Sequence, residues 1–239
     1  MKDELSIVIP TKNEEKYIGK LLNSLSQQTY PIKDTEIFIA DANSTDNTRR
    51  IVNEYSNRFN MNIKIINGGL PAVGRNNGAK QSNSKYILFL DADVVLGWNN
   101  LIEKTIDIAN KKNKDLITVS LYCPDKNYFA KFLYSITNIL VRLSKYINCP
   151  FATGMYFFIR RTEYEKHGGF PEDFGFAEDY ALSKKISGCK FKVIPGHIKV
   201  TDRRFKTTGY LQMITLFLTT MIFPLKTKTN FDYWKNPHE

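Results

Sequence analysis

Two acidic residues separated by a single residue, Asp91 and Asp93, follow an apolar segment that begins at Tyr86. Side chains alternate along a strand, so both carboxylates can project the same way where the strand opens into a loop. Mg²⁺ and Mn²⁺ prefer such oxygen ligands, keep open positions and bridge to substrate phosphates. The pair therefore predicts a divalent-metal site for a phosphate-bearing substrate, while a solvated strand end or a helix cap explains an isolated pair equally well.

Polar residues also follow two other predicted strands. Residues 5–10 are apolar and end at Pro10, after which Thr11 and Glu14 stand in a polar loop. The next strand ends at Asp41. Capping of the following helices accounts for most of these polar residues, but Asp41 is left over. A carboxylate at a strand end can accept a hydrogen bond from a nucleobase or a ribose.

A glycine-rich segment, residues 68–79, enters a predicted helix and carries one arginine, Arg75. Glycines permit close approach of the backbone, and an arginine can pair with a phosphate or stack on a base. The segment has neither the phosphate-loop spacing nor the dinucleotide-binding spacing of glycines, which disfavours kinase and dehydrogenase functions.

Apolar strands alternate with amphipathic helices through the first half of the chain. This pattern predicts an α/β fold with a mostly parallel sheet covered by helices on both faces. In such sheets ligands bind beyond the carboxyl ends of the strands, where the polar residues described above are expected to meet. The predicted strands are residues 5–10, 36–41, 62–66, 86–91 and 115–121, and the predicted helices are residues 15–28, 45–57, 72–81 and 101–111.

The composition indicates one large domain with a basic surface. A chain of 239 residues that is 42% hydrophobic can bury one substantial core. Three widely spaced cysteines, Cys123, Cys149 and Cys189, argue against a disulfide framework or a zinc site. They fit a cytoplasmic location, and the amino end does not read as an export signal. The net charge of +10 suits an acidic partner, but the sequence contains no recognisable nucleic-acid-binding module.

Two apolar segments lie outside the strand pattern. Residues 128–147 place apolar side chains at helical spacing, which is typical of core packing but also permits partial insertion into a membrane. Residues 210–225 are uncharged and too short to span a bilayer. They predict an interfacial helix whose basic neighbours reach the phosphates of an anionic membrane, or else a helix that covers the core. We therefore expect a catalytic domain at residues 1–205 and an amphipathic, membrane-associating segment at residues 206–239 packed on it.

The motifs, taken in order, resemble those of the family 2 inverting glycosyltransferases of the GT-A fold. Five motifs in the family's order make a specific match, which spans about residues 5–205. The resemblance implies a UDP- or GDP-sugar as donor and Mn²⁺ or Mg²⁺ as cofactor. The matching segments are Ile7-Val8-Ile9-Pro10-Thr11-Lys12-Asn13-Glu14-Glu15, Asp41-Ala42-Asn43-Ser44-Thr45-Asp46, Gly74-Arg75-Asn76-Asn77-Gly78-Ala79, Asp91-Ala92-Asp93 and Glu178-Asp179.

The resemblance also implies a role for each residue of the donor site. A nucleoside diphosphate gathers negative charge as it leaves, and a metal ion neutralises that charge. The implied roles are a nucleotide pocket lined by Pro10, Thr11 and Glu14, a nucleobase contact at Asp41, a base or phosphate contact at Arg75, a ribose and metal contact at Asp91, and metal coordination by Asp93.

Inversion requires a base on the opposite face of the sugar, and the resemblance assigns that role to Asp179 with Glu178 as its support. Acidic residues favour the first turn of a helix in any case, so capping is an alternative explanation for both. Apolar neighbours nevertheless suit a carboxylate whose pKa must rise toward neutrality for base catalysis.

Family members often place a cation or a histidine after the catalytic helix to close over the diphosphate, and Arg203 and Arg204 are the candidates here. His197 is a rival as a third metal ligand, but its position after Pro195 and Gly196 favours a surface turn. The Gln-x-x-Arg-Trp motif of processive members is absent from the sequence, which favours transfer of a single sugar.

These observations predict a metal-dependent inverting glycosyltransferase that moves one hexose to a polyprenyl-linked acceptor. We expect it to act as a peripheral protein at the cytoplasmic face of the membrane. Two alternatives remain open. A nucleotidyltransferase would use a similar sheet and similar carboxylates but would release diphosphate from a nucleoside triphosphate. A non-catalytic protein that binds sugar nucleotides or membranes would show affinity without turnover.

Overall fold

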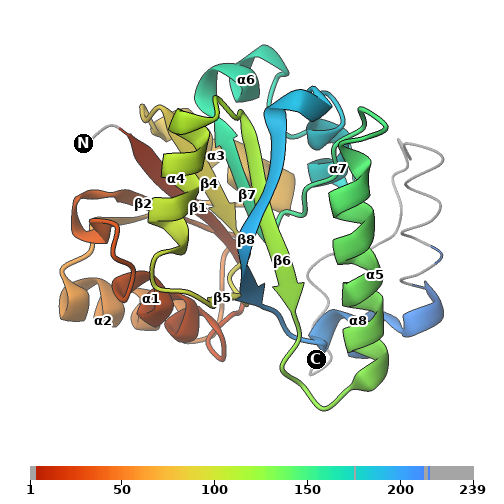
Figure 1. Cartoon of the computed structure of the whole chain (residues 1–239). Coiled ribbons are helices and arrows are strands. Elements are labelled where there is room, and N and C mark those ends of the chain that lie inside the picture. Colours follow the sequence, from red (N-terminus) through yellow and green to blue (C-terminus); the bar gives the residue numbers. More distant parts are fainter. Residues whose placement is uncertain (1–3, 175, 213–214, 216–239) are drawn as a thin grey trace.

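The computed structural model describes residues 4–174, 176–212 and 215 of the chain (Figure 1). Within this range the strands are β1 (Leu5–Thr11), β2 (Glu36–Asp41), β3 (Ile63–Asn67), β4 (Tyr86–Leu90), β5 (Val95–Leu96), β6 (Leu116–Tyr122), β7 (Tyr156–Arg160) and β8 (Phe191–Lys199). The α-helices are α1 (Ile18–Ser26), α2 (Thr48–Phe59), α3 (Pro71–Gln81), α4 (Leu101–Lys111), α5 (Tyr128–Ser144), α6 (Arg161–Lys166), α7 (Glu178–Ser183) and α8 (Arg203–Thr208). Two short 3₁₀ helices are η1 (Ile32–Asp34) and η2 (Gly188–Lys190).

The strands form one sheet in the order β3-β2-β1-β4-β7-β6-β8-β5. β3, β2, β1 and β4 are parallel neighbours, and so are β6 and β8. β7 returns antiparallel between β4 and β6, and the short β5 pairs antiparallel with β8 at the edge. The predicted α/β fold with a mostly parallel sheet is therefore confirmed.

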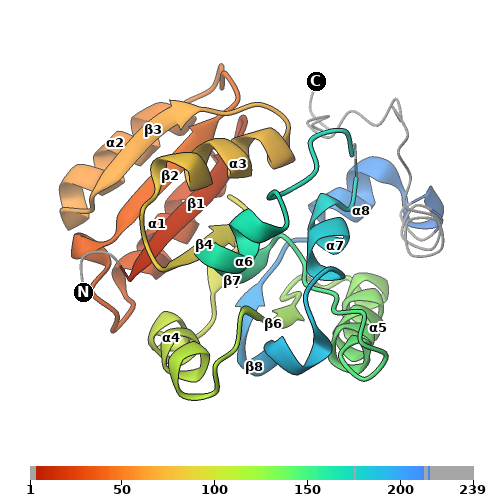
Figure 2. The same ribbon diagram turned by 90° about the horizontal axis from the view of Figure 1, so that it is seen from above.

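Both faces of the sheet are covered, which explains why its strands are continuously apolar instead of alternating with polar residues. Every residue of β1 and β4 is buried. Ile7 and Ile9 lie in the cluster formed with α1, α2 and α4, whereas Val8 faces the cluster formed with α3, α6 and α7. Seen from above, α1 and α2 lie at one end of the molecule and α5, α7 and α8 at the other (Figure 2).

The first two helices begin later than their sequence patterns predict, because the preceding loops bind each other. The backbone N–H of Asn13 donates to Ser44 Oγ at 2.9 Å, and that of Glu14 donates to Thr48 Oγ1 at 2.8 Å. Asn13 and Asn43 both adopt left-handed backbone conformations, with φ of 52° and 57°. The loops after β1 and β2 are thereby fixed side by side at the carboxyl edge of the sheet.

The prediction of a surface turn at His197 was wrong, because Pro195 and Gly196 lie inside β8. Thr118 of β6 pairs with Val193, whereas Ser120 pairs with His197, so β8 bulges between these two positions. A bulge accommodates both a proline, which cannot donate to the ladder, and a glycine. The His197 ring instead contacts the rings of Trp98 and Tyr122.

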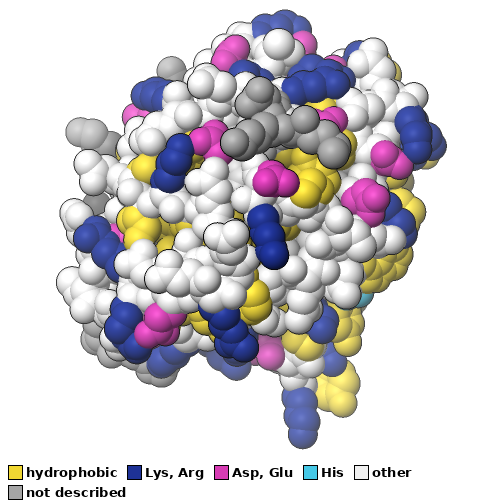
Figure 3. All heavy atoms as spheres, turned by 90° about the vertical axis from the view of Figure 1, so that its left-hand side faces the viewer, with side chains coloured by type: hydrophobic (Ala, Val, Ile, Leu, Met, Phe, Trp, Pro, Cys, Tyr) yellow, Lys and Arg dark blue, Asp and Glu magenta, His cyan; other side chains and the backbone are white. Residues whose placement is uncertain are grey.

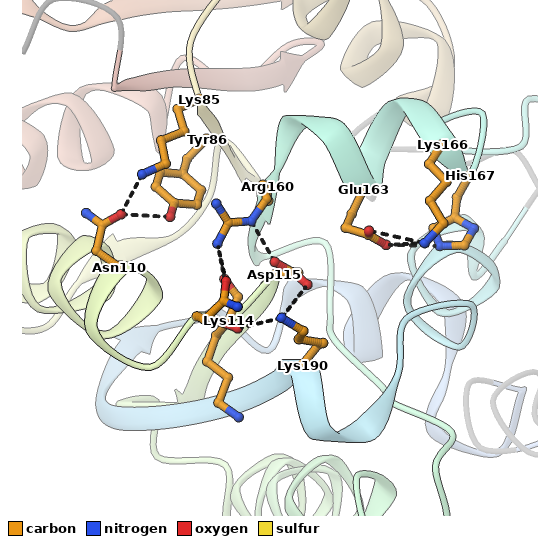
Figure 4. Close-up of polar contacts among 11 residues, drawn as sticks. Lys85, Tyr86, Asn110, Lys114, Asp115, Arg160, Glu163, Lys166, His167 and Lys190 are labelled. Carbon is orange, nitrogen blue, oxygen red and sulfur yellow. Dashed lines mark hydrogen bonds and ion pairs between the residues drawn. The ribbon is translucent and has the colours of Figure 1, made fainter.

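At the end of the sheet opposite the carboxyl ends of the parallel strands, charged residues hold the antiparallel strand β7 in place (Figure 4). Arg160, at the end of β7, contacts Asp115 before β6 through Nε at 2.6 Å. Lys190, which precedes β8, approaches the other oxygen of Asp115 at 3.7 Å. This cluster joins β6, β7 and β8 far from the carboxyl ends of the parallel strands, so we assign it a structural role.

The predicted carboxyl-terminal segment, residues 206–239, lies mostly outside the described residues. Of the predicted helix at 210–225, only residues 210–212 and 215 are described. Among the residues that the structure describes, none of the helices combines the length and the apolar composition needed to cross a bilayer.

Close packing of α3 on β1 gives a first prediction, for the Gly78→Ala variant. A Cβ at Gly78 would overlap both methyl groups of Val8, a stiff, fully buried side chain. Overpacking exceeds the gain in helix propensity, so we expect the free energy of unfolding to fall by about 1–2 kcal/mol in urea denaturation. Lys80→Ala, on the exposed side of the same helix, is the matched control and should change stability by less than about 0.5 kcal/mol. Equal stability of the two variants would contradict this account of the packing.

Candidate active site

The carboxyl ends of β1, β2 and β4 bring the predicted donor residues to one edge of the sheet. Thr11 and Asp41 are register partners in the parallel pair of β1 and β2. Thr11 is fully buried, and its hydroxyl donates to the carbonyl of Ile9 at 3.1 Å. Pro10 is also buried beside it. Both residues therefore shape the edge of the site mainly through their backbone.

Asp41 is a buried carboxylate with protein partners on both oxygens. Arg49 Nε lies 2.6 Å from Oδ2, and the N–H of Ser44 donates to the same oxygen at 3.1 Å. The Ser44 hydroxyl bonds to Oδ1. Asp41 also borders a pocket of about 410 Å³ with Lys12, Asn67 and Gly68. The predicted contact between Asp41 and a nucleobase would therefore add to, or displace, the pairing with Arg49.

Arg75 is the most deeply buried cation of the site, with a relative exposure of 1%. Its Nη2 lies 2.6 Å from Asp91 Oδ1, and its Nη1 pairs with Glu178 at the start of α7. The guanidinium also stands over the ring of Phe170 at 5.3 Å from the centroid. One arginine on α3 thus joins the loop after β4 to the helix that carries the predicted base.

Gly154 leaves the space that this arginine occupies. A Cβ at Gly154 would overlap Nη2 of Arg75. The backbone N–H of Gly154 donates to Asp179 Oδ2 at 2.6 Å, and the N–H of Tyr180 donates to Oδ1 at 2.7 Å. The carboxylate of Asp179 is therefore oriented by two backbone donors next to the pair of Arg75 and Glu178.

Electrostatics suit Asp179 to act as a base. Burial, together with the neighbouring Glu178 carboxylate, raises the pKa of Asp179 to about 6. Arg75 and the two backbone donors oppose that rise. A carboxylate with such a pKa is ionised at neutral pH and is a stronger base than an ordinary aspartate.

A second arginine, Arg203 on α8, connects Glu14 to Asp93. Its guanidinium contacts both oxygens of Glu14, at 2.6 and 2.9 Å, and Asp93 Oδ2 at 3.0 Å. Burial raises the pKa of Glu14 to about 7, which the Arg203 hydrogen bond opposes and the Asp93 charge increases. The predicted donor residue after β1 and the predicted metal ligand are therefore held by one cation.

Arg204 follows in the same helix and is partly buried. Burial raises the pKa of Tyr134 on α5, and the positive charge of Arg204 opposes that rise, so Arg204 lies within electrostatic reach of α5. Arg203, in contrast, faces the acidic residues and stands 4.7 Å from the centroid of the Tyr17 ring. The two arginines that the resemblance grouped together thus have different surroundings.

Asp91 and Asp93 fit a metal ion that is shared with a substrate. β4 ends at Leu90, so the two carboxylates lie in the following turn and not on the strand itself. Within residues 4–174, 176–212 and 215, no three His, Cys, Asp or Glu side chains gather to hold a metal alone. Two carboxylates suit Mn²⁺ or Mg²⁺ when phosphate oxygens complete the coordination. His197, whose ring contacts are aromatic, is not part of such a group.

Asp93 and Arg203 border a pocket of about 650 Å³. The pocket is large enough for a diphosphate and a sugar, and its other lining residues include both cations and acids. The basic lining residues besides Arg203 are Lys16, Lys20, Lys199 and Lys206.

Several contacts of the site have no signal in the sequence. Phe170 lies between the motifs, and neither its spacing nor its type indicates that it would support Arg75. Thr201 donates a hydrogen bond through its hydroxyl to Asp93 Oδ2 at 3.4 Å, and the sequence gives no indication of this contact either. Both depend on chain segments that meet only in the folded protein.

The fold and these motifs define an α/β protein of the GT-A class, and comparison with known proteins gives its family. The chain belongs to glycosyl transferase family 2, whose family model matches residues 6–168. Among curated relatives, poly(ribitol-phosphate) beta-N-acetylglucosaminyltransferase TarS of Staphylococcus aureus is 30% identical over 188 residues, covering 76% of this chain. The match covers 32% of the TarS sequence, so this chain spans about a third of that relative's length. Poly(ribitol-phosphate) beta-glucosyltransferase of Bacillus spizizenii is 38% identical over 138 residues, covering 56% of this chain and 22% of that protein.

Solved structures share the fold. S. aureus TarS 1-349 in complex with UDP-GlcNAc superposes with a TM-score of 0.66 at 23% identity, covering 84% of this chain and 59% of that one. Mannosyltransferase PcManGT from Pyrobaculum calidifontis, in complex with GDP-Man and Mn²⁺, gives 0.65 at 20% identity, covering 80% of this chain and 55% of that one. These likenesses confirm the predicted GT-A fold.

The pKa of Asp179 gives a second prediction, on the pH dependence of activity. If Asp179 must be ionised to act, kcat/KM should rise with pH through an acidic limb near pH 6. Glu178→Gln removes a negative charge that raises the pKa of Asp179, so the limb should move to lower pH. Glu165→Gln, at an exposed position, is the control and should leave the limb in place. A limb that moves upward in Glu178→Gln would refute the assignment.

Proposed function

We propose that this protein transfers one sugar from a nucleotide diphosphate sugar, a UDP- or GDP-hexose, to an acceptor with inversion at the anomeric carbon. The observation that carries the proposal is the double pairing of Arg75 with Asp91 and Glu178. It joins Asp91, one of the two carboxylates suited to a metal ion and a diphosphate, to the helix that presents the oriented carboxylate of Asp179. Membership of the glycosyl transferase family supports this reading.

The proposed reaction uses the described residues as follows. When the nucleophile is a hydroxyl group, as in a polyprenyl-linked sugar, Asp179 accepts the proton of that hydroxyl while the hydroxyl oxygen attacks the anomeric carbon from the side opposite the leaving group. A polyprenyl phosphate would attack through an oxygen that is already ionised and would need Asp179 less as a base. The bond between the anomeric carbon and the diphosphate oxygen breaks, and its electron pair leaves with the nucleoside diphosphate. Arg203, already beside Asp93, supplies positive charge near the place where that leaving group would gather its charge. Mn²⁺ or Mg²⁺ held by Asp91 and Asp93 would neutralise part of the same charge when bound.

Orientation of the base is the second contribution of the protein. The two backbone donors, Gly154 and Tyr180, fix the carboxylate of Asp179 without neutralising it. Glu178 keeps Arg75 in place and raises the basicity of Asp179 through its charge. We therefore assign Glu178 to positioning and Asp179 to the proton transfer.

For the acceptor we propose a polyprenyl-linked sugar or polyprenyl phosphate. The names of two relatives indicate acceptors rich in phosphate, namely poly(ribitol phosphate). Both acceptor classes carry phosphate groups, and the lysines that border the 650 Å³ pocket can pair with them. Transfer assays with polyprenyl-linked acceptors and with poly(ribitol phosphate) as alternative acceptors distinguish the two acceptor classes.

The third prediction separates donor binding from chemistry. In calorimetric titrations with UDP- and GDP-sugars in the presence of Mn²⁺, Asp93→Asn should weaken binding of the preferred donor by about tenfold or more, because a metal ligand is lost. Asp179→Asn should keep donor affinity, while transfer and donor hydrolysis fall by about 100-fold or more, because the base is lost. Asp107→Asn on the surface of α4 is the matched control.

The same experiment tests the alternatives. Full turnover in Asp179→Asn would contradict the proposed base. Release of diphosphate from a nucleoside triphosphate would instead identify a nucleotidyltransferase. Donor binding without turnover, in the wild type and with every acceptor, would identify a non-catalytic binding protein.

A further inference from the structure

One face of α5 is apolar and, among the residues that the structure describes, exposed from its first residue to its last turn. Among the described residues, 13 large hydrophobic side chains are exposed. Nine of these 13 lie in α5 or in the three residues that follow it. Those nine are Tyr128, Phe129, Phe132, Ile136, Ile139, Leu140, Leu143, Tyr146 and Ile147. We call this set the outer face of α5.

The outer face of α5 is a continuous stripe. At 100° per residue its nine positions fall within an arc of about 120°. The buried residues of α5, among them Tyr134 and Val141, occupy a separate arc and contact the sheet clusters. Of the two explanations given for the apolar stripe at residues 128–147, core packing therefore does not hold for its exposed members. Phe132, Ile139 and Leu143 are 58%, 56% and 53% exposed.

The charged side chains that α5 itself carries are all positive, whereas two acidic residues, Asp125 and Asp202, lie beside its N-cap residue Asn127. Lys126, Lys131, Arg142 and Lys145 lie along or beside the helix, and residues 126–162 contain no Asp or Glu. On the side of the molecule where α2 lies, in contrast, basic and acidic side chains are interspersed (Figure 3). An apolar stripe bordered by cations matches the surface of an anionic bilayer, with acyl chains below and phosphates at the level of the lysines.

Aromatic residues mark both ends of the stripe. Tyr128 and Phe129 stand at the first turn and Tyr146 just after the last. Amphipathic aromatic side chains favour the level of lipid headgroups. The surface continues onto the segment after α8, where Tyr210 contacts the Phe129 ring at 4.9 Å and Leu211 is exposed.

The helix also connects to the catalytic region. Its last residue, Ser144, accepts a hydrogen bond from the N–H of Phe151 at 2.9 Å. The ring of Phe151 packs against that of Tyr180 of α7, with 5.6 Å between the ring centroids. The Sγ atom of Cys149 and the hydroxyl oxygen of Tyr180 share a hydrogen bond of 3.4 Å. α5, α7 and α8 lie at the same end of the molecule (Figures 1 and 2). A surface docked through α5 would thus lie close to the helix that carries Asp179.

We propose that the outer face of α5 docks the protein onto an anionic lipid bilayer, with its apolar side chains entering the headgroup boundary and its lysines contacting lipid phosphates. The inference concerns binding alone and does not depend on the proposed transfer reaction. An acceptor in the membrane would then lie on the side of the protein where α7 carries Asp179.

Flotation with vesicles tests the proposal. The full chain is mixed with vesicles of phosphatidylcholine alone or with phosphatidylglycerol, and the bound fraction is measured. We expect binding to the anionic vesicles that weakens with salt. The triple variant Phe132→Ser, Ile139→Ser, Leu143→Ser should reduce the partition coefficient by about tenfold or more. Leu70→Ser, which removes an exposed apolar side chain elsewhere, is the control and should bind as the wild type does.

Charge reversal gives an independent arm of the test. Lys126→Glu with Lys131→Glu should reduce binding by about tenfold or more, because each cation near an anionic membrane contributes to affinity. Lys104→Glu with Lys112→Glu, on and after α4, makes the same change in net charge on another element and should have a much smaller effect.

Several outcomes would overturn the proposal. The proposal fails if the wild-type protein binds neither type of vesicle. It also fails if the α5 variants bind as well as the wild type. A dimer that the triple variant dissociates in solution would show that a second copy covers the face. A lower unfolding midpoint in the triple variant would show that another part of the chain covers it. Donor binding, measured separately without lipid, distinguishes failure of this proposal from failure of the proposed function.

Discussion

A buried arginine has to find counter-charges, and in this fold that requirement organises the site. Arg75 is almost completely enclosed, and an unpaired charge there would cost several kcal/mol, of the order of 3–5. Asp91 and Glu178 supply the counter-charges, Phe170 supplies an aromatic face, and Gly154 leaves the necessary space. The loop that would hold the donor and the helix that carries the base are consequently fixed with respect to each other.

A second cation repeats this arrangement at the rim. Arg203 connects Glu14, from the loop after β1, to Asp93, from the loop after β4. Glu14 is buried enough for its pKa to rise to about 7, so its charge depends on what stands beside it. A phosphate group or a metal ion entering the 650 Å³ pocket would compete for the same partners. The rim is thus the part of the site whose charge pairing has to rearrange when a donor binds.

The sequence indicated the fold and the carboxyl-edge location of the site well, since strand and helix periodicity and strand-end polar residues depend on local patterns. β2 and α4 have the predicted bounds, residues 36–41 and 101–111. β8 could not be predicted, because a bulge hides a proline and a glycine inside a strand. The partners of Arg75 could not be predicted either, since Glu178 is 103 residues away. For α5, periodicity gave the apolar face but not the direction in which it points.

The measurement that tests this account most directly is made on Arg75→Lys, a variant that keeps the charge but cannot bridge two carboxylates as a guanidinium does. Donor affinity and the rate of transfer at saturating donor are determined on protein whose fold is checked by circular dichroism. The account predicts that both fall, each by roughly tenfold or more, because one side chain positions both halves of the site. Weaker donor binding with an unchanged transfer rate would contradict it, since Arg75 would then serve the donor alone.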